Sequence, residues 1–88
     1  MYQFYIGSNN QSHKIELDKI REVLADYEVK GYTILDSLGY WEGKPEDSII
    51  LQVEGITKSK ALTLLQVFKT RLEQVAIGLQ RLPEVQFI

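Results

Sequence analysis

Apolar and polar side chains alternate with a period of two at the start of the chain, between residues 2 and 7. The apolar positions would face a core, while Gln3 and Tyr5 would lie on the opposite side. The side chains expected to point inward are Tyr2, Phe4 and Ile6. This alternation predicts a half-buried first strand.

Two later segments repeat apolar side chains at the spacing of an amphipathic helix. The first segment is followed by Gly31, a residue that commonly ends a helix, so we expect this helix to run from about Leu17 to Lys30. The second helix is expected over residues 61–75. The apolar stripes consist of Leu17, Ile20, Val23, Leu24 and Tyr27 in the first helix and of Ala61, Leu64, Leu65, Phe68, Leu72 and Val75 in the second.

Between the two helices lie two segments rich in β-branched, aromatic and aliphatic residues, at 32–35 and 48–54. In the later segment Ile49, Leu51 and Val53 share one face, which indicates a strand packed on the core. We expect a hairpin in which the loop Gly39–Asp47, punctuated by glycine and proline, is longer than the commonest hairpin connections.

The expected order of elements is strand, helix, strand, strand, helix, strand. The last strand lies in the C-terminal tail, where Pro83 favours an edge strand or a bulge. Right-handed crossovers then give an α+β ferredoxin-like βαββαβ sandwich, with an antiparallel four-stranded sheet and two helices on one face. At 88 residues the chain has material for one domain, 1–88. Tyr5 and Ile50 would make the uncovered sheet face partly apolar, so we expect a homo-oligomer, a dimer or a trimer.

Composition and charge exclude several partners and compartments. Ten basic and twelve acidic side chains are dispersed along the chain and give a formal charge of -2, which argues against nucleic acid as a partner. The sequence contains no cysteine, which suits a reducing compartment. It has neither a signal-peptide pattern nor an apolar run of about 18 residues, so we expect a cytoplasmic protein that does not enter a membrane.

The expected loop carries the strongest candidates for a ligand-binding site. Tyr40 and Trp41 are adjacent large aromatics beside Gly39, and Lys44 lies further along the same segment. One of the two aromatics is expected to pack inward, leaving the other for a ligand or a subunit contact. Asp36 interrupts an apolar strand and joins them as a candidate, either on the exposed sheet face or paired with another group.

Other chemistry is weakly supported. His13, the only histidine, follows a polar turn and lacks an identifiable partner, so a solvated loop residue is the simpler interpretation. The turn at Ser8, Asn9 and Asn10 could bind an anion, but ordinary turn chemistry explains it as well. One histidine and scattered carboxylates do not form a metal site, and no sequence motif identifies a cofactor.

Residues 17–24 and 29–40 resemble the first half of the PII signalling proteins. In that family a helix of this pattern leads to a glycine, a threonine-containing strand and the start of the mobile T-loop. The resemblance implies a ferredoxin-like trimer that binds nucleotides or other small metabolites between subunits and relays occupancy to a partner protein. It would place the base of the T-loop at Gly39, Tyr40 and Trp41.

A second resemblance is to small bacterial ferredoxin-like proteins with a Thr-x-Leu-Asp segment followed by glycine and tryptophan. The matching residues here are Thr33, Leu35, Asp36, Gly39 and Trp41. That group brings no established function with it, so this resemblance implies only the fold.

Three functional hypotheses follow. The first is a non-enzymatic, small-molecule-responsive regulatory module of PII-like type. The second is a dimeric α+β barrel enzyme that acts on a small hydrophobic substrate in a pocket between helices and sheet. The residues expected to line that pocket are Tyr5, His13, Asp36, Tyr40 and Trp41. The third is a structural or interaction subunit without a ligand, and fold analogy alone does not choose among the three.

Overall fold

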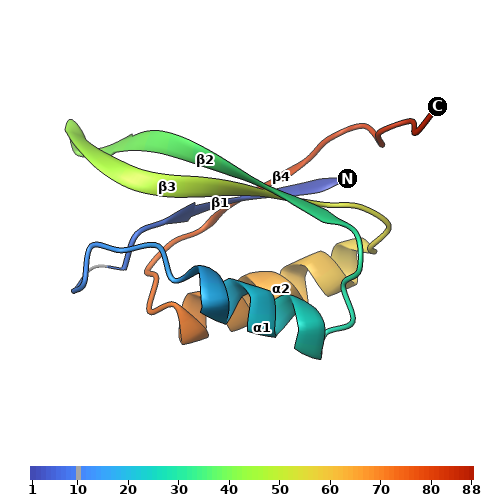
Figure 1. Cartoon of the computed structure of the whole chain (residues 1–88), viewed down its shortest axis with the longest axis horizontal. Coiled ribbons are helices and arrows are strands. Elements are labelled where there is room, and N and C mark those ends of the chain that lie inside the picture. The colour runs from blue at the N-terminus through green and yellow to red at the C-terminus, as the bar shows by residue number, and fades with distance from the viewer. Residues whose placement is uncertain (10) are drawn as a thin grey trace.

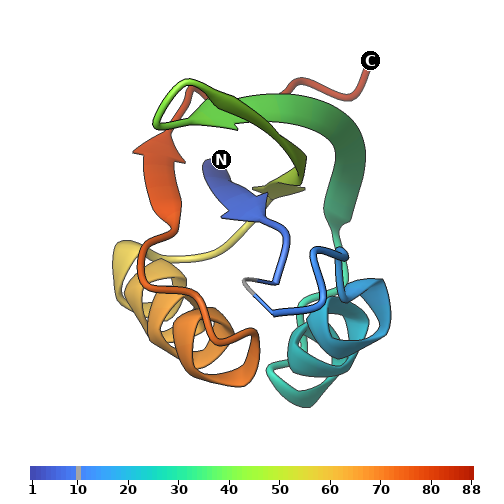
Figure 2. The ribbon, with the colours of Figure 1, turned by 90° about the vertical axis from the view of Figure 1, so that its left-hand side faces the viewer.

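A computed structural model describes residues 1–9 and 11–88 and has the predicted α+β ferredoxin-like architecture. A four-stranded antiparallel sheet, in the order β2-β3-β1-β4, is covered on one face by two helices (Figures 1 and 2). The elements are β1 (Tyr2–Gly7), α1 (Leu17–Asp26), β2 (Tyr32–Trp41), β3 (Lys44–Val53), α2 (Lys58–Arg71) and β4 (Gly78–Arg81).

The core lies between the sheet and the helices. Alternation in β1 buries Tyr2, Phe4 and Ile6, as the sequence predicts, because these side chains face the helices. Phe4 meets Phe68 of α2 edge to face, with ring centroids 5.6 Å apart. From α1 the core receives Ile20, Val23 and Leu24, and from β3 it receives Ile49, Leu51 and Val53. The hydrophobic pattern therefore predicts the inward face of each of these elements correctly.

Both helices end in the same way, and the predicted stop at Gly31 is wrong. The first helix ends at Asp26, and Glu28 follows with a left-handed φ of 57°. The Val29 amide donates to the Leu24 carbonyl at 2.8 Å, the bond that defines a Schellman motif. The second helix repeats this geometry with Glu73 at φ 53°. Two glutamates occupy positions that usually hold glycine, which is why the sequence placed the first stop too late.

The prediction of a long loop over Gly39–Asp47 is also wrong. The second strand continues to Trp41 and the third starts at Lys44, so only Glu42 and Gly43 form the turn. Both have positive φ, 52° and 77°, as in the two-residue turns that match the twist of a hairpin. The long hairpin extends past the ends of both helices (Figure 1).

Pro45 is tolerated inside β3 because of where β1 stops. It pairs with Tyr40 of β2, whereas β1 ends opposite Ser48. In this outer part of the hairpin β3 therefore has an unpaired edge, a position in a sheet where proline is found.

The C-terminal strand is short and lies at an edge of the sheet. β4 pairs only with β1, and it ends before Pro83, as expected for an edge strand beside a proline. The residues that follow, including Val85 and Phe87, lie in a tail without strand pairing. The ammonium group of Met1 anchors the start of this tail through an ion pair with Glu84.

Candidate functional site

The five residues predicted to bind a ligand all lie on the β2–β3 hairpin, but not on one side of it. Trp41 pairs across the strands with Lys44, while Tyr40 pairs with Pro45 and points to the opposite face. Both aromatics are exposed, at 69% for Tyr40 and 66% for Trp41, so the expectation that one packs inward is wrong. The reason is that this end of the hairpin reaches beyond the helices, where there is no core to receive a side chain.

The other predicted residues divide between the two faces of the hairpin. Asp36 lies opposite the buried Ile49, on the helix-covered face of the outer strand, where it is exposed and its carboxylate makes no hydrogen bond or ion pair with another described residue. The expectation that Asp36 lies on the open sheet face or is paired is therefore wrong. Gly39 lies opposite Glu46, and a Cβ there would come within 3.4 Å of Ser48 Oγ. The structure thus places Gly39, Trp41 and Lys44 on one face of the hairpin and Asp36 and Tyr40 on the other.

Trp41 forms one wall of a groove at the end of the sheet. The groove has a volume of about 480 Å³ and joins the hairpin, the end of β1 and the segment that connects α2 to β4. Its lining consists of Tyr5, Gly7, Trp41, Glu46, Gln74, Val75, Ala76 and Gly78. Trp41 was predicted from the sequence as a binding residue, while most of the other lining residues were not.

A hydrogen-bonded row across the open sheet face fixes the aromatic wall opposite Trp41. Gln52 Nε2 donates to Gln3 Oε1 at 2.8 Å, Gln3 Nε2 donates to the Tyr5 hydroxyl, and this hydroxyl donates to Gln80 Oε1 at 2.9 Å. The Tyr5 ring lies over Gly78, where an added Cβ would come within 3.0 Å of Tyr5 Cδ2. The absence of a side chain at Gly78 therefore lets the Tyr5 ring lie against β4. The phenolic oxygen of Tyr5 is already engaged in its two hydrogen bonds, with Gln3 and Gln80.

The polar end of the groove is built on the chain just after β1. Glu46 Oε1 accepts hydrogen bonds from the Ser8 amide at 3.0 Å and from Ser8 Oγ at 3.4 Å. Gln74 Nε2 donates to the Ser8 carbonyl at 2.8 Å. Ser8 is only 5% exposed, so these bonds satisfy backbone groups that water would not reach. They also hold the Glu46 carboxylate and the Gln74 amide above Gly7.

Lys44 and His13 border a second hollow, which shares Trp41 and Glu46 with the groove. It has a volume of about 250 Å³, and its lining also includes Ser8 and Asn9. His13 is exposed, has a left-handed φ of 58°, and donates its backbone N–H to the Asn9 carbonyl at 2.8 Å. This supports its interpretation as a loop residue. Asn10, part of the candidate anion site in the turn, lies outside the described residues.

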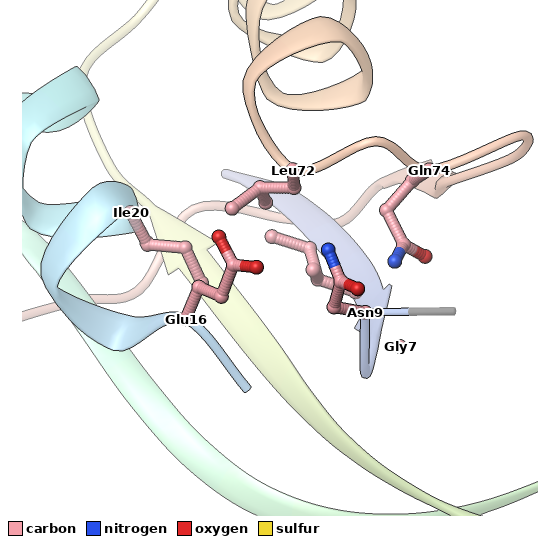
Figure 3. A pocket seen from close by; sticks show the side chains of 7 residues that line it. Gly7, Asn9, Glu16, Ile20, Leu72 and Gln74 are labelled. Atoms are coloured by element: carbon pink, nitrogen blue, oxygen red, sulfur yellow. The ribbon is translucent and has the colours of Figure 1, made fainter. Parts of the chain in front are cut away.

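A barrel enzyme would need a pocket between the helices and the sheet. Figure 3 shows the hollow at this position, which is closed. The hollow there lies between Glu16 and Ile20 of the first helix region, Leu72 after α2, and Asn9 and Gln74. It has no room for a water molecule.

Glu16 forms an ion pair with Lys19 at 2.7 Å, and this contact raises the pKa of the Lys19 ammonium.

Within the described part of the chain, no three His, Cys, Asp or Glu side chains lie close enough together to hold a metal ion. Neither described helix is long and apolar enough to cross a membrane.

The sheet order and the two helices on one face place the chain in the class of ferredoxin-like α+β folds. Among solved structures it is similar to the periplasmic divalent cation tolerance protein CutA from Archaeoglobus fulgidus, with a TM-score of 0.56 and 15% sequence identity. The match covers 100% of this chain and 88% of that one. No protein-family model matches the sequence, and no curated protein is similar to it.

At 15% identity the similarity to CutA shows the fold alone. It agrees with the PII-like architecture that the sequence resemblance implied, and it does not extend to a signalling role. The related structure is described as periplasmic, so the cytoplasmic location expected from the sequence stays a prediction.

Proposed function

We propose that this protein is a non-enzymatic, small-molecule-responsive regulatory module of PII-like type, and that its ligand binds in the groove beside Trp41. The observation that carries the proposal is the groove itself. It combines aromatic and aliphatic walls with a few fixed polar groups, the usual makeup of a small-molecule site, and its volume of about 480 Å³ suits a metabolite.

The position of the groove also provides a route for a response. Trp41 belongs to the projecting hairpin, whereas Gln74 and Ala76 belong to the connection between α2 and β4, and Gly78 is the first residue of β4. A ligand that contacts both parts would favour one arrangement of the hairpin relative to the body, and only such a difference in affinity can shift a conformational equilibrium. The exposed aromatic and aliphatic side chains of the hairpin, Leu38 and Tyr40, offer contacts for a protein partner.

Self-association is part of the proposal. β2 and β4 are both edge strands, and Tyr5, Leu35 and Ile50 give the open face of the sheet apolar surface. Exposed edges and apolar patches of this kind are commonly covered in an assembly. A homodimer or homotrimer would cover them.

Thermal unfolding in the presence of a metabolite library tests the proposal. A ligand at a hundredfold excess over its Kd stabilises the folded state by about 2.7 kcal/mol, which is easily seen as a higher Tm. Trp41→Ala should lose this stabilisation, while Tyr40→Ala, a control of similar exposure on the opposite hairpin face, should keep it. If no compound stabilises the wild type, or if Trp41→Ala responds like the wild type, the proposed site is wrong.

A further inference from the structure

We infer that the groove beside Trp41 selects an organic cation, specifically an ammonium group attached to an apolar body. This inference rests on the proposed function and adds the chemical class of the ligand. It follows from three properties of the lining: which hydrogen-bonding groups remain free, which charges are present, and how the aromatic rings flank them.

The polar side-chain groups that remain free in the groove are two acceptor oxygens and one amide N–H of Gln74. Glu46 uses Oε1 to accept from Ser8, and Gln74 uses Nε2 to donate to Ser8, so each keeps one oxygen for another partner. No described residue donates a hydrogen bond to Glu46 Oε2 or Gln74 Oε1. Two acceptors, one of them negatively charged, outweigh the single remaining N–H of Gln74, so the groove matches the N–H groups of a ligand better than its oxygens.

The Glu46 carboxylate and the Gln74 amide oxygen both lie above the backbone of Gly7. A Cβ built on Gly7 would fall within 2.4 Å of Glu46 Oε1 and 3.6 Å of Gln74 Oε1. The same region of the groove therefore presents a carboxylate and an amide oxygen within reach of one small cationic group. Hydrogen bonds from an ammonium to a carboxylate are roughly twice as strong as neutral ones.

The charges around the groove favour the same ligand class. None of the described residues that line the groove is lysine, arginine or histidine, and Glu46 is the one charged side chain among them. Lys44 lines the second hollow, which shares Trp41 and Glu46 with the groove, and it forms no ion pair with Glu46. A phosphate or carboxylate ligand in the groove would meet the Glu46 charge with no cation among the lining residues to balance it, whereas an ammonium would neutralise that charge.

The walls suit the apolar part of such a ligand. Trp41 and Tyr5 present aromatic surface, and Val75 and Ala76 present aliphatic surface. A cation near the face of an aromatic ring gains further attraction, which is strongest for tryptophan. Neighbouring aromatic rings and a carboxylate are the groups that recognise an amine.

Three probes of the same shape and different charge test the inference: 2-phenylethylamine, 2-phenylethanol and phenylacetate. Their Kd values are measured at pH 7 by NMR titration of the ¹⁵N-labelled protein. We expect the amine to bind at least about tenfold more tightly than the alcohol, and the carboxylate to bind most weakly. The amide signals that shift should belong to Gly7, Ser8 and residues 74–78.

Glu46→Gln is the decisive variant, because its amide oxygen can still accept from Ser8 while the negative charge is lost. It should reduce the preference for the amine over the alcohol by about tenfold. Glu42→Gln removes the same charge from the same hairpin but not from the groove, so it should leave the preference unchanged. Both variants should give wild-type far-ultraviolet circular dichroism.

Equal affinities for the three probes, tighter binding of phenylacetate, or an unchanged preference in Glu46→Gln would each overturn the inference. In those cases binding in the groove, and with it the proposed function, would still stand. If none of the probes shifts the groove signals, the inference fails, while the proposed function is decided separately by the thermal screen with Trp41→Ala.

Discussion

Gly7→Ala tests whether the polar end of the groove is built as described. The added Cβ would lie 2.4 Å from Glu46 Oε1, closer than real atoms approach, so the flexible carboxylate must move away. It then loses its hydrogen bonds to the Ser8 amide and hydroxyl, and leaves a backbone N–H unpaired on a residue that is 5% exposed. A hydrogen bond to a charged group contributes about 1.5–3 kcal/mol, so we expect a loss of about 2 kcal/mol in the free energy of unfolding.

Urea unfolding followed by circular dichroism measures this loss at one fixed protein concentration. For a chain of this size, a loss of about 2 kcal/mol corresponds to a Tm lower by roughly 10 °C. Gly31→Ala is the matched control, because no heavy atom lies within 4 Å of the Cβ it would add. It should leave stability unchanged or raise it slightly, since alanine restricts the unfolded chain.

A double-mutant cycle assigns the loss to its cause. In a Glu46→Ala background there is no carboxylate to displace, so Gly7→Ala should cost much less there than in the wild type, with a coupling of about 1 kcal/mol or more. If Gly7→Ala is as stable as the wild type, or if its cost is the same in both backgrounds, then Glu46 does not lie over Gly7 as the structure places it.

Other predictions concern the helix end, the hairpin turn, the core and the C-terminal carboxyl pair. Glu28→Gly and Glu42→Asn should each stabilise the protein by about 0.5–1 kcal/mol in urea unfolding, because each glutamate has a positive φ that glycine or asparagine adopts more easily; a destabilised variant would contradict the assigned backbone geometry. Phe68→Ala should cost about 3–5 kcal/mol, since the ring is fully buried, and a cost below about 1 kcal/mol would mean that it is not in the core. The pKa of Glu54 is raised above its ordinary value of 4.5 by its hydrogen bond with Glu84 and by burial. Because the folded state binds this proton more tightly than the unfolded chain, protonated Glu54 stabilises the protein below pH 4.5. This stabilisation is lost as the pH rises through the folded-state pKa. The Tm of Glu54→Gln, relative to that of the wild type, should therefore be higher at pH 7 than at pH 4. An equal Tm difference at the two pH values would refute the hydrogen bond between Glu54 and Glu84.

Hydrophobic periodicity was sufficient to predict the fold, because each predicted stripe belongs to an element that buries most of it. Val75, the last position of the second helical stripe, is an exception, since it lies beyond the end of α2 and is 84% exposed. The alternation of Phe4 and Ile6 and the helical spacing of Ile20 and Leu24 lead directly to the layers seen in the structure. The same reasoning failed where a residue adopts an unusual backbone conformation. Glu42 has a positive φ in the two-residue turn, but glutamate is not typical of such turns. An Asn-Gly sequence at the same place would have predicted the turn clearly.

The candidate site was only partly predictable for a different physical reason. Trp41 was identified because a large aromatic beside glycines, outside any apolar stripe, lacks a role in the core. Glu46 and Gln74 carried no such signal, since an isolated glutamate and an isolated glutamine are common surface residues. They meet because the register pairs Gly7 with Ser48 and because the turn after α2 directs residue 74 back toward β1. Neither feature can be derived from composition or spacing alone.

The proposed function requires that a small molecule binds against Trp41, and the fluorescence emission of this residue reports such binding. Trp41 is the only tryptophan in the chain, so intrinsic fluorescence reports on one wall of the groove. A titration with the compound that most raises the Tm should change the intensity or wavelength of this emission saturably. Its midpoint should match the Kd from calorimetry of the same compound. Binding heat with unchanged Trp41 emission would place the ligand elsewhere and contradict the proposed site.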